Sequence, residues 1–458
     1  DVVLSATDVR NETQTLLTTY KNLLAFASGD ANAVAPSGAD YALLGVTQLV
    51  ESRAVDFMNS VLVLQPLESL DTAEKLSERA EAVNTLYYTA DIADVSSAST
   101  DSNAISVEQL ALLGQVVTSA QLASVRAFIA SKADVDITDS AALTGLVEAV
   151  ITAAERIQAY SEDPTAALDT ANGGLGAPAP LDYEVVLAGT GLAVSDVVAL
   201  NELLADSDVA VGSTDLQAEL SAIVRVHNQL YALADGVDND GIVASGSGSS
   251  LETLTQADLL TVGVTGLDAA DDTAKVMSLL NSVLDERPFA ELDEAAELQA
   301  LAEAVVAVRT TLAQGADAAA ALTQAQSALL GLSAVTADNL GAIKAVMARD
   351  GANDFNDLAS FADLEALTAD VVSALAELSG HTTLDPDPAN NPASDTYLRA
   401  GVSGVSADNL LAVNAQLRLV SGGDKDSLDE LNALVTAAND ALAYLLSDIA
   451  PLTDTTTT

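Results

Sequence analysis

Gly401-Val-Ser-Gly-Val-Ser-Ala-Asp-Asn-Leu410 agrees at seven of ten positions with Gly331-Leu-Ser-Ala-Val-Thr-Ala-Asp-Asn-Leu340, which lies 70 residues earlier in the chain. Self-similarity at a fixed spacing is typical of tandem-repeat folds. Weaker copies are Leu44-Gly-Val-Thr47, Leu113-Gly-Gln-Val116, Ala188-Gly-Thr-Gly-Leu192 and Gly263-Val-Thr-Gly-Leu267. Counted from residues 45, 114, 188, 263, 331 and 401, the spacings are 69, 74, 75, 68 and 70 residues. This period predicts a series of similar small units.

Hydrophobic spacing predicts that each unit consists of two or three short helices. In the last unit a first helix begins near Ser406, and a second begins after Gly422-Gly423. The apolar positions of this second helix recur every three or four residues: Leu428, Leu431, Val435, Ala438, Leu442 and Leu445. Ser427 and Glu430 give it an S-x-x-E capping box, and Thr214 and Gln217 give an earlier helix a T-x-x-Q start.

The predicted fold class is therefore all-α, a tandem array of small helical bundles of about 70 residues forming an extended rod. Aromatic residues make up only 3% of the chain, so Ala, Leu and Val must form the cores, which suits thin bundles. Predicted boundaries are a partial repeat at 1–38, six repeats at 39–105, 106–181, 182–254, 255–321, 322–394 and 395–452, and a Thr-rich tail at 453–458.

Residues 7–26 resemble the second helix of a unit without its preceding partners. The sequence begins with Asp1 and not with Met, so we expect that a leader has been removed or that the chain is a piece of a longer one. We expect self-association at the apolar face of this segment, which is formed by Leu16, Leu17, Tyr20, Leu23 and Leu24.

Charge limits the partners. The chain has 17 Lys and Arg against 67 Asp and Glu, a formal net charge of −50, which repels nucleic acids and anionic membranes and suits divalent cations, high salt or basic partners. The longest run without charge, 318–337, contains Thr, Gln, Ser and Gly331, so it predicts no membrane span. The absence of cysteine excludes disulfides, zinc–cysteine sites and thiol nucleophiles. Acidic, cysteine-free chains occur among exported bacterial surface proteins and in halophile cytoplasm, and we favour export.

The segment from Gly401 to Asn414 resembles helical tandem repeats of very large bacterial surface and biofilm-associated adhesin-type proteins, whose units carry motifs like G-V-T-G-V-T-A-D-N-L-A-A-V-N. Gly331 to Leu340 matches this motif well and Gly263 to Leu267 matches it in part, so roughly the C-terminal half carries the resemblance. The resemblance implies a secreted protein at the cell surface, an extended rod, and a role in adhesion, a filament, biofilm matrix or surface layer. It supplies no catalytic residues.

Acidic loops at the junctions are candidate calcium sites because calcium needs several converging oxygens. The stronger candidate is formed by Asp385, Asp387, Asn390 and Asp395 on a proline-rich turn. A second candidate, with Asp235, Asp238 and Asp240, does not fit the EF-hand register. The alternative is that these are solvated turns, because Asp is common in turns and helix caps. Ca2+ is the only cofactor that the sequence suggests.

Catalytic groups are few, and we predict that the chain is not an enzyme. His227 lies on the stripe of Leu220, Ile223 and Leu230 and is expected to be packed in a core, and His381 is expected to cap a helix end. The predicted function is an extracellular structural repeat protein. The alternative is a ligand- or glycan-binding segment of an adhesin, for which Tyr87, Tyr88 and Tyr183 are candidate sugar platforms. A hydrolase built from carboxylates alone is a third and weaker reading.

Overall fold

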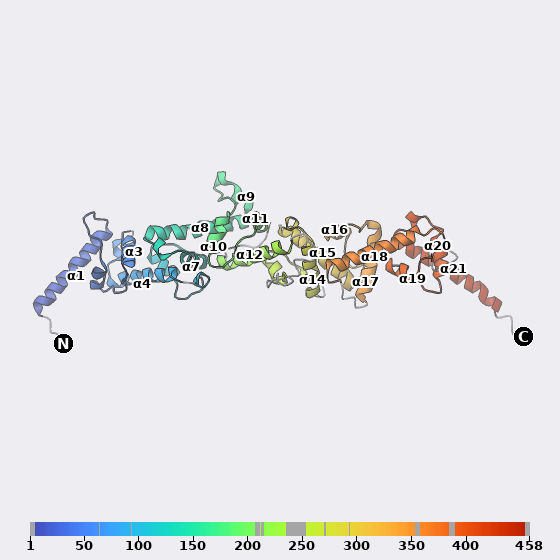
Figure 1. The fold of residues 1–458 in the computed structure, drawn as a ribbon, viewed down its shortest axis with the longest axis horizontal. Coiled ribbons are helices and arrows are strands. Elements are labelled where there is room, and N and C mark those ends of the chain that lie inside the picture. Colours follow the sequence, from blue (N-terminus) through green and yellow to red (C-terminus); the bar gives the residue numbers. More distant parts are fainter. Residues whose placement is uncertain are drawn as a thin grey trace. The chain divides into compact units, whose positions relative to one another are not determined.

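The computed structural model describes residues 5–63, 65–92, 94–206, 211, 215–234, 253–269, 272–292, 294–352, 358–383 and 390–453. These residues form helices joined by turns, without a β-strand among them, so the prediction of an all-α fold is confirmed (Figure 1). In the same residues, no helix combines the length and apolar character needed to cross a membrane. The chain divides into two compact units, 1–228 and 229–458, here called the N-terminal and C-terminal halves.

Helices of three kinds alternate in the N-terminal half. Short helices are α2 (Gly38–Leu43), α6 (Val107–Leu112) and α10 (Pro180–Val186). Middle helices are α3 (Ser52–Leu62), α7 (Leu122–Ala130) and α11 (Val197–Asp206). Long helices are α1 (Ala6–Ala27), α4 (Ala73–Ala90), α8 (Ser140–Glu162) and α12 (Leu216–Leu233). Smaller elements lie between them: η1 (Leu67–Ser69), α5 (Val95–Ala98), η2 (Asp134–Asp136), α9 (Pro164–Leu168) and η3 (Thr170–Asn172).

The C-terminal half has the same three kinds of helix in the same order. Short helices are α13 (Gln256–Thr261), α16 (Gln324–Leu329) and α19 (Ser394–Arg399). Middle helices are α14 (Thr273–Asp285), α17 (Ala337–Ala352) and α20 (Leu410–Leu417). Long helices are α15 (Ala295–Gln314), α18 (Phe361–Gly380) and α21 (Leu428–Thr453). The 3-10 turns are η4 (Leu267–Ala269), η5 (Phe289–Glu291) and η7 (Gly422–Asp424).

The ends of the short helices explain why they form at these positions. Most begin at a reciprocal capping box, as at Ser37–Asp40, Ser106–Gln109, Thr255–Asp258 and Thr323–Gln326. Five of them end at a glycine with positive φ, namely Gly45, Gly114, Gly263, Gly331 and Gly401. In each case the next residue's N–H donates to a carbonyl five residues back, for example Val402 to Tyr397 at 2.9 Å. This left-handed helix stop favours glycine, which has no Cβ to strain.

Long helices join successive groups of helices within each half. In the N-terminal half, α4 contacts the middle helix before it, α3, and the next short and middle helices, α6 and α7. In the C-terminal half, α15 contacts α14, α16 and α17 in the same way. Such a helix must be apolar on more than one face, and Leu301, Ala302 and Ala304 of α15, which point in three different directions around the helix, are all buried. Within each half the core is therefore a series of small apolar layers joined by the long helices.

The two halves also match each other in several segments, at an offset of 222 or a few residues less. Asn59-Ser-Val-Leu62 is identical to Asn281-Ser-Val-Leu284, and Ala80-Glu-Ala-Val83 is identical to Ala302-Glu-Ala-Val305. The bonds match as well. The Thr89 hydroxyl accepts the N–H of Ile105 at 2.9 Å, and the Thr311 hydroxyl accepts that of Leu322 at 2.8 Å. Similarly, the hydroxyls of Ser60 and Ser282 accept backbone N–H groups at the start of α8 and α18.

Candidate functional site

A buried tyrosine–asparagine pair ties a short helix to the following middle helix in three places. The Tyr41 hydroxyl donates to Asn59 Oδ1 at 2.7 Å, and Asn59 Nδ2 donates to the Pro36 carbonyl at 2.9 Å. The same three-residue arrangement recurs in Tyr183–Asn201–Pro178 and Tyr397–Asn414–Pro392. Burial raises the pKa of Tyr41, Tyr183 and Tyr397. These polar groups are satisfied by each other, so they are structural and present no reactive group.

The Asp-Asn motif that revealed the repeat also has a structural explanation. The side chain of Asn339 accepts the N–H of Thr336 at 2.8 Å, and that of Asn409 accepts the N–H of Ser406 at 2.7 Å. Both amides then donate to carbonyls of the loop before the helix, those of Ala334 and Gly404. The motif therefore holds the turn into a middle helix and does not form a ligand site.

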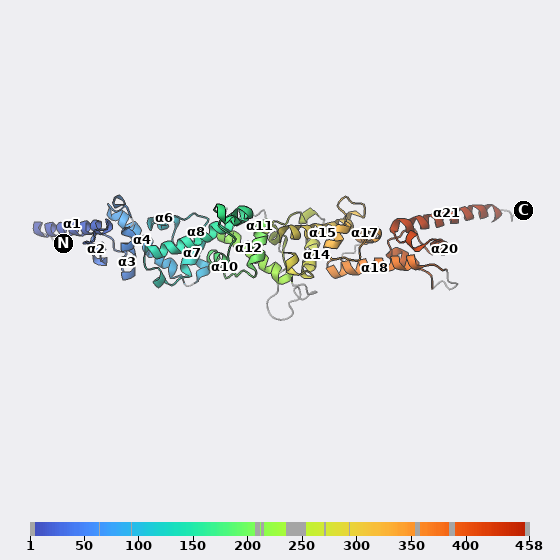
Figure 2. The ribbon, with the colours of Figure 1, turned by 90° about the horizontal axis from the view of Figure 1, so that it is seen from above.

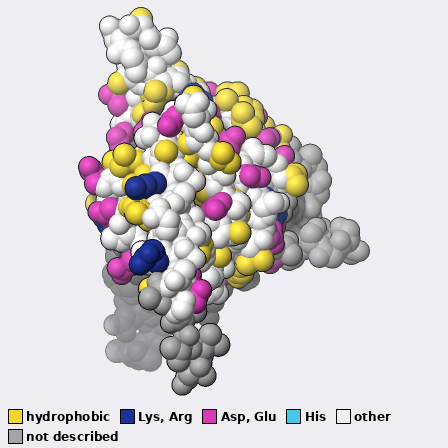
Figure 3. All heavy atoms as spheres, turned by 90° about the vertical axis from the view of Figure 1, so that its left-hand side faces the viewer, with side chains coloured by type: hydrophobic (Ala, Val, Ile, Leu, Met, Phe, Trp, Pro, Cys, Tyr) yellow, Lys and Arg dark blue, Asp and Glu magenta, His cyan; other side chains and the backbone are white. Residues whose placement is uncertain are grey.

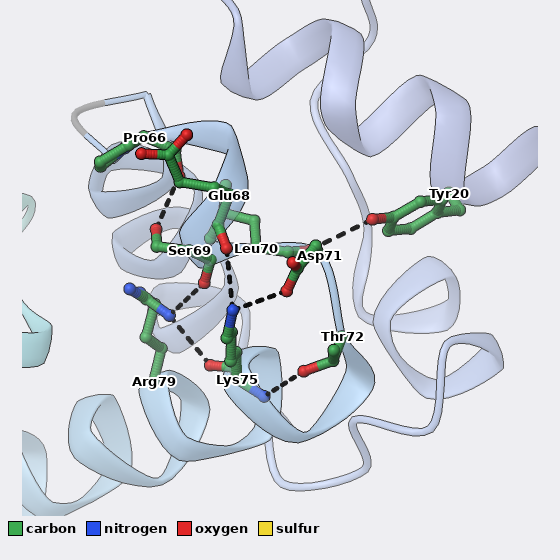
Figure 4. Close-up of polar contacts among 9 residues, drawn as sticks. All are labelled: Tyr20, Pro66, Glu68, Ser69, Leu70, Asp71, Thr72, Lys75 and Arg79. Carbon is green, nitrogen blue, oxygen red and sulfur yellow. Dashed lines mark hydrogen bonds and ion pairs between the residues drawn. The ribbon is translucent and has the colours of Figure 1, made fainter.

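An apolar groove of about 380 Å³ lies beside α1 in the N-terminal half. Its walls come from α1, the end of α2 and the start of α4, and it is lined by Thr13, Leu16, Leu17, Tyr20, Leu44, Asp71, Ala73 and Leu76. In Figure 4, Tyr20 reaches from α1 toward the turn before α4, where its hydroxyl donates to the Leu70 carbonyl at 3.5 Å. The groove thus has one carboxylate on its rim and otherwise suits an apolar occupant.

A network of hydrogen bonds makes this turn rigid (Figure 4). Lys75 Nζ donates to the Glu68 carbonyl at 2.8 Å and lies 2.7 Å from Asp71 Oδ1. The buried Arg79 donates to the carbonyls of Ser69 and Lys75 at 2.8 and 3.1 Å. Arg79 also donates to Gln65 Oε1 at 3.5 Å, so both cations are bonded to oxygens around this turn. Of the charged groups in this network, only Asp71 lines the groove.

The five predicted self-association residues on α1 do not share one environment. Leu16 and Leu17 are each 44% exposed and line the groove, and Tyr20 is half-buried at its edge. Leu23 is 1% exposed, in the core of its own half, and Leu24 is half-buried. Leu23 is therefore unavailable to a partner, because α2 and α3 pack against the end of α1 that carries it.

The predicted calcium sites fall mostly outside the described residues. Asp385 and Asp387 lie outside them, as do Asp235, Asp238 and Asp240. Asn390 and Asp395 are described and exposed. Asp395 is in the first turn of α19, where its carboxylate interacts favourably with the positive end of the helix dipole. Among the described residues, no group of three or more acidic or histidine side chains is placed to hold a metal ion. The calcium prediction stays a prediction, which melting temperatures measured in EDTA and in millimolar calcium would test.

The histidines and tyrosines singled out in the sequence take structural positions. His227 is fully buried in α12, as predicted, and burial lowers its pKa. The backbone carbonyl of His381, and not its ring, makes the contact at the end of α18 by accepting from Lys425 Nζ at 2.6 Å. Tyr87 and Tyr183 are buried, so neither offers a face to a sugar, whereas Tyr88 is exposed and donates to Asp101 at 2.9 Å.

One predicted helix start is wrong. Thr214 lies outside the described residues, and Gln217 was expected to complete a capping box with it. Instead, Asp215 caps α12 by accepting the N–H of Ala218 at 3.1 Å. Gln217 is buried and donates to the carbonyls of Val186 and Ala188, because it holds the turn that follows α10. The other predicted box, Ser427 with Glu430, is confirmed at the start of α21.

A larger groove, of about 560 Å³, lies between η5, α15 and α16 in the C-terminal half. Among the described residues that line it are Arg287, Glu291 and Glu297, and Arg287 pairs with Glu291 at 2.8 Å. No serine, threonine or histidine is among these lining residues, so they contain no nucleophile with a base beside it. Figure 3 views the molecule from the left-hand side of Figure 1, where α1 lies, and on that face hydrophobic side chains lie among carboxylates and few cations.

No family model, curated protein or solved structure matches the chain. The internal match between the two halves is therefore the available comparison. The 70-residue turn pattern does not reveal it, although its signal, Asn-Ser-Val-Leu followed by Pro and by Ala-Glu-Ala-Val, is legible in the sequence. The structure adds the reason for the match, since Asn59, Ser60 and their counterparts make the buried bonds that join helices.

Proposed function

We propose that the chain is a structural repeat protein of a bacterial cell surface, a rod, filament or surface-layer and matrix component built from tandem helical units. The observation that carries this proposal is the recurrence of one turn. Five short helices end in the same glycine stop with the same backward hydrogen bond, at spacings of 69, 149, 68 and 70 residues, of which the second is about two periods. A chain in which the hydrogen bonds that stabilise the fold recur, and reactive groups do not, is suited to forming an extended array of stacked units.

The described polar groups support a structural role over catalysis. The buried hydroxyls of Tyr41 and Tyr397 donate to Asn59 and Asn414, and the amides of these asparagines donate to proline carbonyls. The net charge of −50 keeps neighbouring arrays apart or couples them through cations. The surface location comes from the resemblance of the segment beginning at Gly401 to repeats of bacterial surface proteins. Labelling of intact source cells with antibodies against the chain would test that location.

An in-phase deletion tests the tandem character. Removing residues 331–400 joins Leu330, the last residue before one glycine stop, to Gly401, the glycine of the next. A rod should lose about one long-helix length, roughly 30 Å for 20 residues, in its maximum dimension by small-angle X-ray scattering. A compact globule of this size would shrink by only a few ångströms, because its radius grows with about the 0.38 power of length.

The control removes half a period, residues 366–400. It cuts through α18 and joins Glu365 to Gly401, positions that are not equivalent, so it should lose helicity and cooperative unfolding by circular dichroism. If both deletions unfold, or if the in-phase variant keeps its maximum dimension, the tandem-rod proposal is wrong.

A further inference from the structure

The apolar stripe of α1 is exposed at its start and buried at its end. Its members follow heptad-like spacing: Val9, Thr13, Leu16, Tyr20, Leu23 and Ala27. Val9 is 50% and Leu16 44% exposed, whereas Leu23 and Ala27 lie in the core with α2 and α3. A stripe of this kind is stable in water only when a second apolar surface covers it, and here the cover reaches only its second half.

The stripe of α21 has the opposite polarity. Leu431, Val435 and Ala438 are buried where α21 packs on α20 and α17. Further along the same face, Leu442 is half-buried and Leu445 is 56% exposed, with Leu446 exposed beside it. The helix continues well past α20 (Figures 1 and 2), so its second half carries the stripe beyond its cover.

Helix α4, inside the N-terminal half, shows how such a stripe is completed. Its members follow the same spacing and are all buried: Leu76, Ala80, Val83, Tyr87 and Ala90. Their cover comes from more than one element, since α4 contacts α3, α6 and α7. A long helix inside this fold can therefore have its stripe buried over its whole length, whereas the stripes of α1 and α21 are each buried over only half of their length.

We propose that the exposed half of the α21 stripe from one copy of the chain docks in the groove beside α1 of a second copy. The groove is lined by the exposed half of the α1 stripe, and its apolar walls fit Leu442, Leu445 and Leu446. This interface rests on the proposed structural function and specifies how copies join. It is heterologous, because two different surfaces meet, so it generates open chains of molecules.

Charge favours this pairing over a pair of like helices. α1 carries Arg10 and Lys21 together with Asp8 and Glu12, so its net charge is about zero, whereas the α21 sequence contains four Asp and Glu residues and no Lys or Arg. Two α21 helices side by side would bring like charges together and would leave the α1 groove empty. The pairing of α21 with α1 covers both stripes and avoids that repulsion.

Two variants of the full chain test this interface. Leu16→Asp and Leu445→Asp each place a carboxylate in one of the two faces at an exposed site, so the fold should persist by circular dichroism. By sedimentation velocity the wild-type chain should associate in a concentration-dependent way, and each variant alone should bind its own copies more than about tenfold more weakly. An equal mixture should form a dimer that does not extend, because one intact α21 meets one intact α1.

Matched controls are Leu411→Asp and Leu181→Asp, which change leucines that are 72% and 66% exposed outside the two stripes. Both controls should associate like the wild-type chain. The proposal is overturned if the wild-type chain stays monomeric up to about 1 mM, if Leu445→Asp alone still associates, or if the mixture gives no dimer. Such a failure would leave the tandem-rod proposal intact, because the in-phase deletion tests that proposal within a single copy.

Discussion

Tyr41 donates its buried hydroxyl to Asn59 Oδ1 over 2.7 Å, and so ties the short helix α2 to the middle helix α3. Replacing Tyr41 with Phe keeps the ring and removes the donor. Asn59 Oδ1 is then left buried without this bond, and we expect the free energy of unfolding to fall by about 1–3 kcal/mol in urea titrations. Asn59 keeps its other bond, to the Pro36 carbonyl, so the fold should persist.

The control for this change is Tyr88→Phe. Tyr88 also donates to an oxygen at 2.9 Å, that of Asp101, but it is exposed, so water replaces the lost bond. Its effect should be within about 0.5 kcal/mol. Equal effects of the two changes would show that the buried pair does not hold α2 on α3.

Much of the local structure could be predicted from the sequence because it depends on neighbouring residues. The capping box of Ser427 and Glu430, the burial of His227 and the all-helical character are confirmed. Residues 45, 114, 263, 331 and 401, from which the period was counted, are glycines with positive φ, since only that residue type ends a helix there without strain.

Long-range partners could not be predicted in the same way. Gln217 has the spacing of a capping residue, yet its side chain bonds carbonyls that lie 31 and 29 residues earlier. Tyr183 is of the residue type that forms sugar platforms, yet its side chain is buried and its hydroxyl donates to Asn201. In both cases a tertiary contact decided the role, and single-residue patterns carry no record of it. The match at an offset of 222 is visible in the sequence and consists of residues that make buried hydrogen bonds. The 70-residue period consists of residues that form turns.

Two glycines separate the effect of backbone conformation from that of space. A Cβ added at Gly45 or at Gly145 would meet no atom within 4 Å. Gly45 has φ +87°, so Gly45→Ala should destabilise the chain by about 1–2 kcal/mol. Gly145 lies inside α8 in ordinary helical conformation, so Gly145→Ala should stabilise it by about 0.5–1 kcal/mol. Thermal melts of both variants check the pair, and the same sign in both would contradict the helix-stop assignment.

Lys425 is a fully buried cation in the C-terminal half, and burial lowers its pKa. Its Nζ donates to the carbonyls of His381 and Leu417, at the ends of α18 and α20. Lys425→Met fills the space but leaves two buried carbonyls without a donor, so we expect a loss of about 2–4 kcal/mol in urea titrations. The control is Arg418→Met, which removes an exposed cation seven residues earlier in the chain and should lower the free energy of unfolding by less than about 0.5 kcal/mol. A tolerated Lys425→Met would mean that the helix ends hold together without the cation.

His227 predicts how stability depends on pH. Burial lowers its pKa from the usual 6.5, so the unfolded chain binds its proton at a pH where the folded chain does not. Between the folded pKa and 6.5 the unfolded state therefore holds more protons, and stability falls as pH falls through this window, by up to about 1.4 kcal/mol per pH unit. Melting temperatures of the wild-type chain should drop between pH 7 and pH 5. His227→Gln cannot take up this proton, so its curve should be flatter over the same range. A wild-type curve as flat as that of the variant would mean that the folded state takes up the proton as readily as the unfolded one, and that the core around His227 opens to water.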